Sequence, residues 1–109
     1  FKGCSKDIPI EGTVKLIKFL QESCNIMIVT ARDTSAMDET SDWLINNGIV
    51  YHSIWMRRKG DTRPAAEIKR DIIKDIEKNY GKVDLVFDDD ERNIKMCREE
   101  NIPYVKVSV

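Results

Sequence analysis

The chain has 109 residues, of which 41% are hydrophobic and 34% are charged, and its formal net charge is -1. This length predicts one domain with a single core, and the composition excludes the disordered and membrane-inserted classes of protein. The low net charge excludes a general attraction to nucleic acid, so any such contact must come from a local basic group, of which Arg57, Arg58, Lys59 and Arg63 form one.

The cysteines and the hydropathy pattern indicate the redox environment of the protein and whether it enters a membrane. The sequence has three cysteines, Cys4, Cys24 and Cys97. This odd number, their wide spacing and the lack of a CxxC pair argue against a disulfide framework and against a zinc site. We therefore expect a reducing, cytoplasmic setting. No apolar run is long enough to span a bilayer, so we expect no membrane partner.

The chain begins with a predicted helix followed by a predicted strand. Asp7 and Pro9 indicate a helix start, and apolar residues then recur at helical spacing as far as about Glu22 or Ser23. Residues 25–30 are almost wholly apolar and β-branched. This pattern is typical of a short strand that is buried on both faces.

A second helix and a second strand are predicted next. Met37 and Leu44 share one helix face, and Asn46-Asn47-Gly48 supplies the stop signal for that helix. Residues 49–55 then predict a strand, although His52 and Ser53 interrupt its apolar pattern.

The last part of the chain contains the clearest pattern. From Pro64 to the residue before Gly81, isoleucines recur at helical spacing and predict an amphipathic helix. Residues 83–87 predict a third strand, 91–101 a fourth helix and 104–107 a last strand.

The alternation of helices and strands predicts an α/β fold, with a doubly wound parallel sheet and helices on both of its faces. In such sheets the ligand crevice lies beyond the carboxyl ends of the strands. Thr30 and Asp88 end two of the predicted strands, and Lys69 lies on the helix before the acidic strand. A hydroxyl, an ammonium and carboxylates at this edge predict a site for phosphate and Mg²⁺.

Three consecutive aspartates, Asp88-Asp89-Asp90, follow the apolar run of the third strand. Adjacent carboxylates repel one another, and a divalent cation relieves that repulsion. Alternatively, aspartates at a helix start cap the helix and interact favourably with its dipole. We expect Asp90 to cap the fourth helix and Asp88 and Asp89 to form the magnesium half of the site.

These residues also carry a family resemblance. Val29-Thr30-Ala31-Arg32, Lys69 and Phe87-Asp88-Asp89 resemble, in order and spacing, motifs two, three and four of the haloacid dehalogenase-like (HAD) phosphohydrolases. Over nearly the whole chain, the sequence is most similar to the 3′-phosphatase domain of phage-type polynucleotide kinase-phosphatases. The residues that carry this closer likeness are Arg32, residues 57–63, Lys69, Asp88-Asp89 and Met96. The resemblance implies a HAD-like, Rossmannoid fold.

The resemblance implies catalytic and metal-binding roles for four residues. Thr30 would hydrogen-bond the phosphoryl oxygens, and Lys69 would neutralise the phosphate and the charge that develops on the nucleophile. Asp88 would bind Mg²⁺ directly or through water. Asp89 would support the metal ligands or Lys69.

The resemblance also implies a substrate surface. Arg32 and Arg57 would contact phosphate, because the guanidinium fork suits bidentate phosphate recognition. Asp61 and Arg63 would shape the substrate loop. The implied partners are a phosphorylated nucleic-acid end or a nucleotide, together with a further amino-terminal segment or a kinase domain.

One essential motif of the HAD family is missing from the sequence. Motif one ends a strand with DxDGT or DxDxT and supplies the aspartate nucleophile and the general acid and base. Asp7 follows no apolar strand, and Glu11-Gly12-Thr13 lies inside the first predicted helix. In the family, this motif lies on a central strand between those predicted here at 25–30 and 83–87, which places it before Phe1. We therefore expect residues 1–109 to be a single HAD-like domain that lacks its first, central strand and is inactive alone.

The leading hypothesis is a Mg²⁺-dependent phosphatase that acts on a nucleic-acid 3′-phosphate through an aspartyl-phosphate. The first alternative is a HAD phosphatase for a small metabolite or a phosphoprotein. The second is a non-catalytic HAD-like module that binds phosphate, metal or nucleic acid. A response-regulator-like domain also holds Mg²⁺ with acidic pairs, but Thr30-Ala31-Arg32 and the late position of the aspartates count against it.

Overall fold

The computed structural model describes residues 7–108, which divide into two compact units. The first unit comprises residues 7–13 and 64–108, and the second comprises residues 14–63. The boundary falls within helix α1 (Ile10–Leu20). Each unit is built on its own parallel sheet, so the units are described separately.

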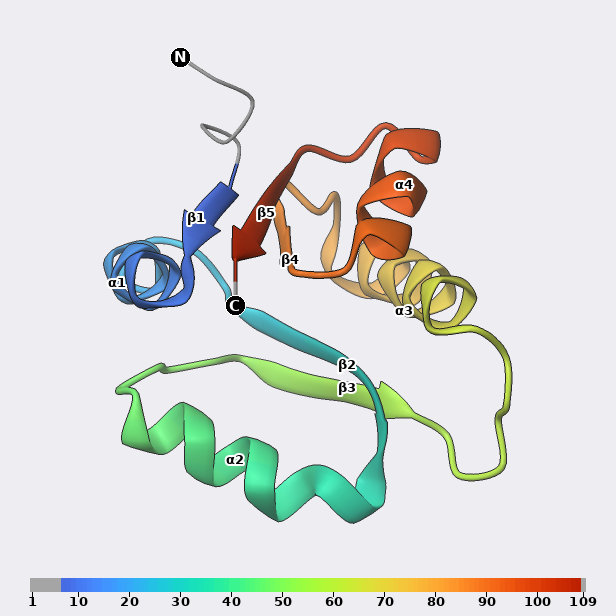
Figure 1. The fold of residues 1–109 in the computed structure, drawn as a ribbon, viewed down its shortest axis with the longest axis horizontal. Helices are drawn as coiled ribbons and strands as arrows, with labels where there is room; N and C mark the ends of the chain where they lie inside the picture. The colour runs from blue at the N-terminus through green and yellow to red at the C-terminus, as the bar shows by residue number, and fades with distance from the viewer. Residues whose placement is uncertain (1–6, 109) are drawn as a thin grey trace. The chain divides into compact units, whose positions relative to one another are not determined.

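The first unit contains a three-stranded parallel sheet (Figure 1). Its strands are β1 (Asp7–Pro9), β5 (Tyr104–Ser108) and β4 (Val86–Asp88), in the order β1-β5-β4. Helices α3 (Ala65–Tyr80) and α4 (Glu91–Glu99) lie side by side. β4 is therefore an edge strand of this sheet, and its outer edge pairs with no other described strand of the unit.

The core of this unit lies between α3, α4 and the sheet. Ile73, Met96, Cys97 and Ile102 form a buried cluster, against which Val83, Val86 and Tyr104 pack. The predicted apolar face of α3 is confirmed, because its buried residues are Ile68, Ile72, Ile73 and Ile76. Burial of such a face is what stabilises an amphipathic helix.

The second unit contains the strand pair β2 (Met27–Asp33) and β3 (Ser53–Arg57), which are parallel. A short 3₁₀ helix, η2 (Thr34–Ala36), and helix α2 (Met37–Asn46) connect them. The predicted Gly48 stop signal has a physical basis, because Gly48 has a φ of +70°, which is strained for residues with a side chain.

The segment after α1 fixes the loop that leads to β3. Gln21 donates from Nε2 to the Gly48 carbonyl at 3.5 Å and accepts from the Val50 amide at 2.9 Å. The Ile49 side chain between them is buried. These contacts tie the loop before β3, which begins at Ser53, to the segment after α1.

The fold class is confirmed as mixed α/β with parallel strands, but several strand boundaries differ from the prediction. β2 and β3 end later than expected, at Asp33 and Arg57. β1 was missed altogether; it forms because residues 7–9 pair with β5. Pro9 cannot donate a ladder hydrogen bond, and β1 is an edge strand, where proline is tolerated.

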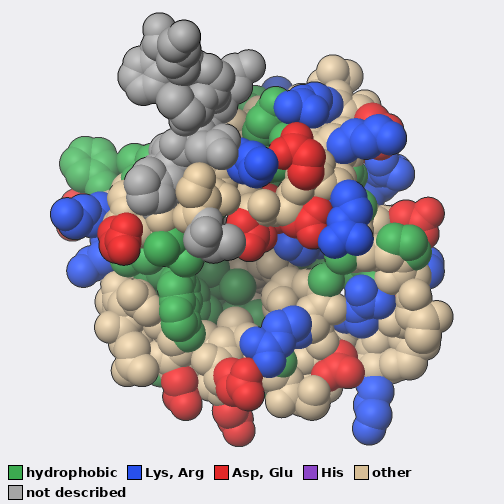
Figure 2. Space-filling model, viewed as in Figure 1, with side chains coloured by type: hydrophobic (Ala, Val, Ile, Leu, Met, Phe, Trp, Pro, Cys, Tyr) green, Lys and Arg blue, Asp and Glu red, His purple; other side chains and the backbone are tan. Residues whose placement is uncertain are grey.

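The described residues carry mixed surface charge and two free cysteines. On the face shown in Figure 2, basic and acidic side chains are interspersed, in keeping with the low net charge. Cys24 is exposed and free, and Cys97 is buried and free, whereas Cys4 lies outside the described residues. No helix within residues 7–108 is long and apolar enough to cross a membrane.

Candidate active site

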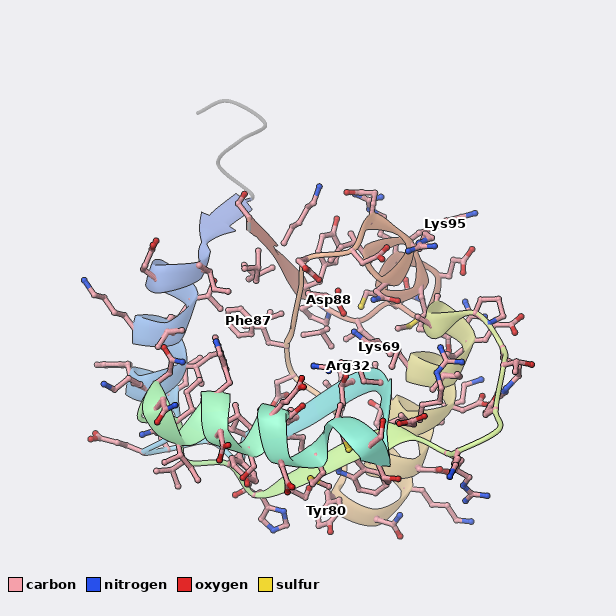
Figure 3. The ribbon with its side chains drawn as sticks, turned by 60° about the horizontal axis from the view of Figure 1, so that its bottom comes forward. Arg32, Lys69, Tyr80, Phe87, Asp88 and Lys95 are labelled. Atoms are coloured by element: carbon pink, nitrogen blue, oxygen red, sulfur yellow. The ribbon has the colours of Figure 1, made fainter. Side chains whose placement is uncertain are left out.

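The first unit brings Lys69 and Asp88 together, as Figure 3 shows. Asp88 is the last residue of β4, and its side chain is 6% exposed. Lys69 projects from the second turn of α3, and its Nζ lies 2.8 Å from Asp88 Oδ2. The pair is largely removed from water, where an ion pair is more strongly coupled than on the surface.

Two further donors complete the surroundings of the Asp88 carboxylate. Asp90 donates its backbone N–H to Oδ1 at 2.9 Å. Asn93 donates from Nδ2 to Oδ1 at 3.1 Å and to Oδ2 at 3.2 Å. Each carboxylate oxygen therefore accepts two hydrogen bonds, so Asp88 is held in one orientation by contacts from α3, α4 and the connecting turn.

Asp90 caps α4, which confirms the prediction for the third aspartate. Its Oδ1 accepts the Arg92 backbone N–H at 2.8 Å, and its Oδ2 lies 2.7 Å from Arg92 Nη2. Hydrogen bonds from Arg92 lower the pKa of Asp90 to about 2. Both oxygens of the Asp90 carboxylate are thus bonded to Arg92 at the start of α4.

The depressed pKa of Asp90 predicts an acid-sensitive contribution to stability. A carboxylate whose pKa is lower in the folded state than its ordinary 3.8 stabilises the fold above about pH 4, and this contribution is lost as the pH falls through about 2. Asn is also a good helix cap, so Asp90→Asn should keep the cap and lose the charge. We expect the variant to lose less stability than the wild type between about pH 4 and pH 2.

Thermal unfolding across this pH range tests the prediction. Asp84→Asn is the matched control, because Asp84 is exposed and pairs with no residue among those described. Equal pH dependence of Asp90→Asn and the wild type would show that the Asp90 charge contributes nothing.

In the second unit, Thr30 lies at an irregularity in β2. Thr30 pairs with Met56, but the next paired residue of β2 is Asp33, opposite Arg57. Ala31 and Arg32 are therefore extra residues on this strand, as in a bulge. Thr30 Oγ1 accepts the Arg32 backbone N–H at 3.1 Å. Bulges of this kind re-aim side chains and are common beside active sites.

Arg57 links this bulge to the basic loop that follows β3. Its Nε donates to the Ala31 carbonyl at 2.6 Å, and its Nη1 donates to the carbonyls of Asp61 and Arg63 at 2.7 and 2.8 Å. The sequence suggested that Arg57 contacts phosphate. In the structure, Nε and Nη1 of the guanidinium hold two segments of backbone together, and the phosphate contact stays a prediction.

The basic loop has further internal contacts. Asp61 Oδ1 accepts the Arg63 backbone N–H at 3.1 Å, and Asp61 Oδ2 lies 2.9 Å from Arg63 Nη2. Hydrogen bonds from Arg63 lower the pKa of Asp61 to about 2. Arg32 forms a separate, exposed ion pair with Glu39 at 2.6 Å.

Comparison with known proteins decides the family. Residues 1–109 match the family described as "Polynucleotide kinase PNKP phosphatase domain". The chain belongs to this family. It is therefore a HAD-type phosphatase domain of the polynucleotide kinase-phosphatase kind, and phosphatase is the enzyme class of the family.

Solved structures agree with this PNKP-type fold. A chain from "Structure of the Pnkp1/Rnl/Hen1 RNA repair complex" matches with a TM-score of 0.79 and 21% identity, covering 86% of this chain and 31% of that one. A chain from "Structure of Pnkp1/Rnl/Hen1 complex" matches with a TM-score of 0.72 and 21% identity, covering 86% and 33%. This PNKP-type chain thus spans about a third of those chains. No curated protein matches the sequence.

The aspartates of this PNKP-type domain differ in their fitness to bind a metal ion. Asp88 has no free acceptor position while Lys69 and Asn93 hold it. Asp89 is exposed and makes no side-chain hydrogen bond or ion pair with the described residues. Within residues 7–108, no group of three or more His, Cys, Asp or Glu could hold a metal ion. Of these two carboxylates, Asp88 is the one held by hydrogen bonds, and Asp89 is the one left open to solvent.

Two residues of the PNKP-type site were missed by the sequence interpretation. Glu39 was not connected with Arg32, and nothing in the spacing of the two residues on the chain indicates their contact. Asn93 did leave a signal, because it is a polar residue on the otherwise apolar face of α4 that includes Ile94 and Cys97. A buried asparagine at such a position needs a polar partner.

Proposed function

We propose that this chain is part of a Mg²⁺-dependent polynucleotide phosphatase that removes a 3′-phosphate from a nucleic-acid end. The observation that carries the proposal is the buried Lys69–Asp88 pair at the end of β4, in a chain that matches the PNKP phosphatase family throughout its length. A cation held by a fixed carboxylate suits the recognition of a phosphoryl group.

Each side chain of the site has a separate role in this proposed reaction. Thr30 donates its hydroxyl to a phosphoryl oxygen, and Lys69 moves from Asp88 to neutralise the phosphate. Arg32 exchanges Glu39 for a phosphate of the substrate, while Arg57, Asp61 and Arg63 hold the substrate loop. Asp89 would hold Mg²⁺, with Asp88 fixed beside it by Lys69 and Asn93; a bound Mg²⁺ would supply positive charge to neutralise the phosphoryl oxygens.

The nucleophile comes from elsewhere in this proposal. An aspartate of a DxD motif attacks phosphorus, the bond to the leaving oxygen breaks, and the leaving oxygen takes a proton from the second aspartate. Water then hydrolyses the aspartyl-phosphate. A strand carrying this motif would pair with the edge of β4 that no described strand of its unit occupies.

Phosphate release from a 3′-phosphorylated oligonucleotide tests the proposal. We expect the 109 residues to be inactive alone, and a protein with a strand ending in DxDGT joined before Phe1 to release phosphate with Mg²⁺ but not with a chelator. Release by the 109 residues alone would refute the assignment of the nucleophile.

Two comparison substrates separate the alternatives. Preference for a small phosphate ester, with the oligonucleotide untouched, would favour a metabolite phosphatase. Binding of the oligonucleotide without turnover by the extended protein would favour a non-catalytic module.

A further inference from the structure

A buried amide lies beside the Lys69–Asp88 pair. Asn93 is the third residue of α4 and is 3% exposed. Its Nδ2 faces both oxygens of Asp88 at 3.1 and 3.2 Å. Because a carboxylate only accepts hydrogen bonds, this contact also fixes which end of the amide faces Asp88. The other end, Oδ1, is buried and has no partner among the described residues.

The side chain of Asn93 does not serve the helix itself. The Asn93 backbone N–H already bonds to the Asp90 carbonyl at 3.0 Å, and Asp90 caps α4. Met96 and Cys97 supply the core contacts of α4, and Ile94 is buried as well. An apolar residue at position 93 would bury no unpartnered oxygen, so the asparagine carries a cost that its contact with Asp88 must offset.

Asn93 differs from the other two donors to Asp88 because it bonds to both carboxylate oxygens. Lys69 reaches only Oδ2, and the Asp90 backbone N–H reaches only Oδ1. A single bond to Oδ1 leaves the carboxylate able to rotate about its axis. The amide of Asn93 prevents this rotation whether or not Lys69 stays in place.

We propose that Asn93 is a positioning residue, which keeps the Asp88 carboxylate oriented when Lys69 leaves it to bind the substrate phosphate. This inference rests on the proposed function for the departure of Lys69. Lys69 then has two states, paired with Asp88 or with phosphate. The Asp88 carboxylate keeps one orientation in both. Lys69 can then return to the same place after each turnover.

The test compares Asn93→Leu with Ile94→Val in the active, extended protein. Leucine has the same number and branching of side-chain heavy atoms as asparagine but donates no hydrogen bond, whereas Ile94→Val removes a buried methylene and leaves the Asp88 contacts intact. We expect Asn93→Leu to lower kcat by about tenfold to a hundredfold with little change in KM, because a misplaced group affects the reaction more than substrate binding. Ile94→Val should keep kcat.

A second measurement needs neither metal nor turnover. Inorganic phosphate is added to the metal-free protein, and the ¹³C signal of the Asp88 carboxylate is followed by NMR. We expect one sharp signal throughout in the wild type and in Ile94→Val, and a broadened or divided signal in Asn93→Leu. If Asn93→Leu does not fold, hydrogen exchange of the Asn93 side-chain amide is measured in the wild type instead. These amide protons should stay protected from exchange after phosphate is added.

Failure of the positioning role of Asn93 and failure of the proposed function give different results. Equal kcat values and equal Asp88 signals in the two variants would overturn the positioning role, as would exchange of the Asn93 amide protons on phosphate addition. An extended protein with no phosphatase activity would overturn the proposed function, while the Asp88 signal would still decide the role of Asn93.

Discussion

Replacement of Lys69 by methionine should lower the free energy of unfolding by about 3 kcal/mol, because it leaves the Asp88 carboxylate buried without its cation. The Lys69 side chain is 16% exposed and that of Asp88 is 6% exposed, so water cannot readily replace the lost ammonium. Asn93 and the Asp90 amide would remain, and they offset part of the penalty. Urea unfolding at neutral pH measures the change.

Lys74→Met is the matched control on the same helix. The Lys74 side chain is 61% exposed, and its Nζ lies 3.9 Å from Glu100, so its loss should change stability by less than about 0.5 kcal/mol. The double variant Lys69→Met with Asp88→Asn should recover part of the loss, because a neutral amide needs no cation. If Lys69→Met were as mild as Lys74→Met, the pair would be solvated rather than buried.

The two site aspartates should separate stability from activity. Asp89→Asn should leave the free energy of unfolding unchanged, because Asp89 is exposed and its side chain makes no hydrogen bond or ion pair with the described residues. In the active, extended protein it should lower Mg²⁺-dependent phosphate release by more than about a hundredfold, since loss of an outer partner of a metal site already costs tenfold to a hundredfold. Titration of activity with Mg²⁺ and urea unfolding of the same samples test both parts.

Asp88→Asn is the comparison for Asp89→Asn. It should destabilise the fold, because Lys69 would lose its buried carboxylate partner. If Asp88→Asn instead raised the Mg²⁺ requirement without loss of stability, and Asp89→Asn kept full activity, Asp88 would be the direct metal ligand. That result would restore the roles that the family resemblance implied.

Sequence patterns predicted the parts of the fold that depend on local periodicity. The isoleucines of α3 repeat at helical spacing over 16 residues, so the buried face could be read directly. Asp90 could be assigned to the cap of α4 because capping involves residues close along the chain. Strand boundaries were less predictable, because residues 7–9 become a strand only through pairing with β5.

The chemistry of the candidate site divides in the same way. Residue types in a fixed order identified the phosphatase family and singled out Thr30, Lys69, Asp88 and Asp89 as candidate site residues, because that order can be read along the chain. Only the tertiary structure showed that Arg57 donates to three carbonyls. It alone showed that the oxygens of Asp88 are fully occupied and that Asn93 holds them. Hydrogen bonds between segments far apart in the chain depend on distances that folding sets, and residue order carries no record of those distances.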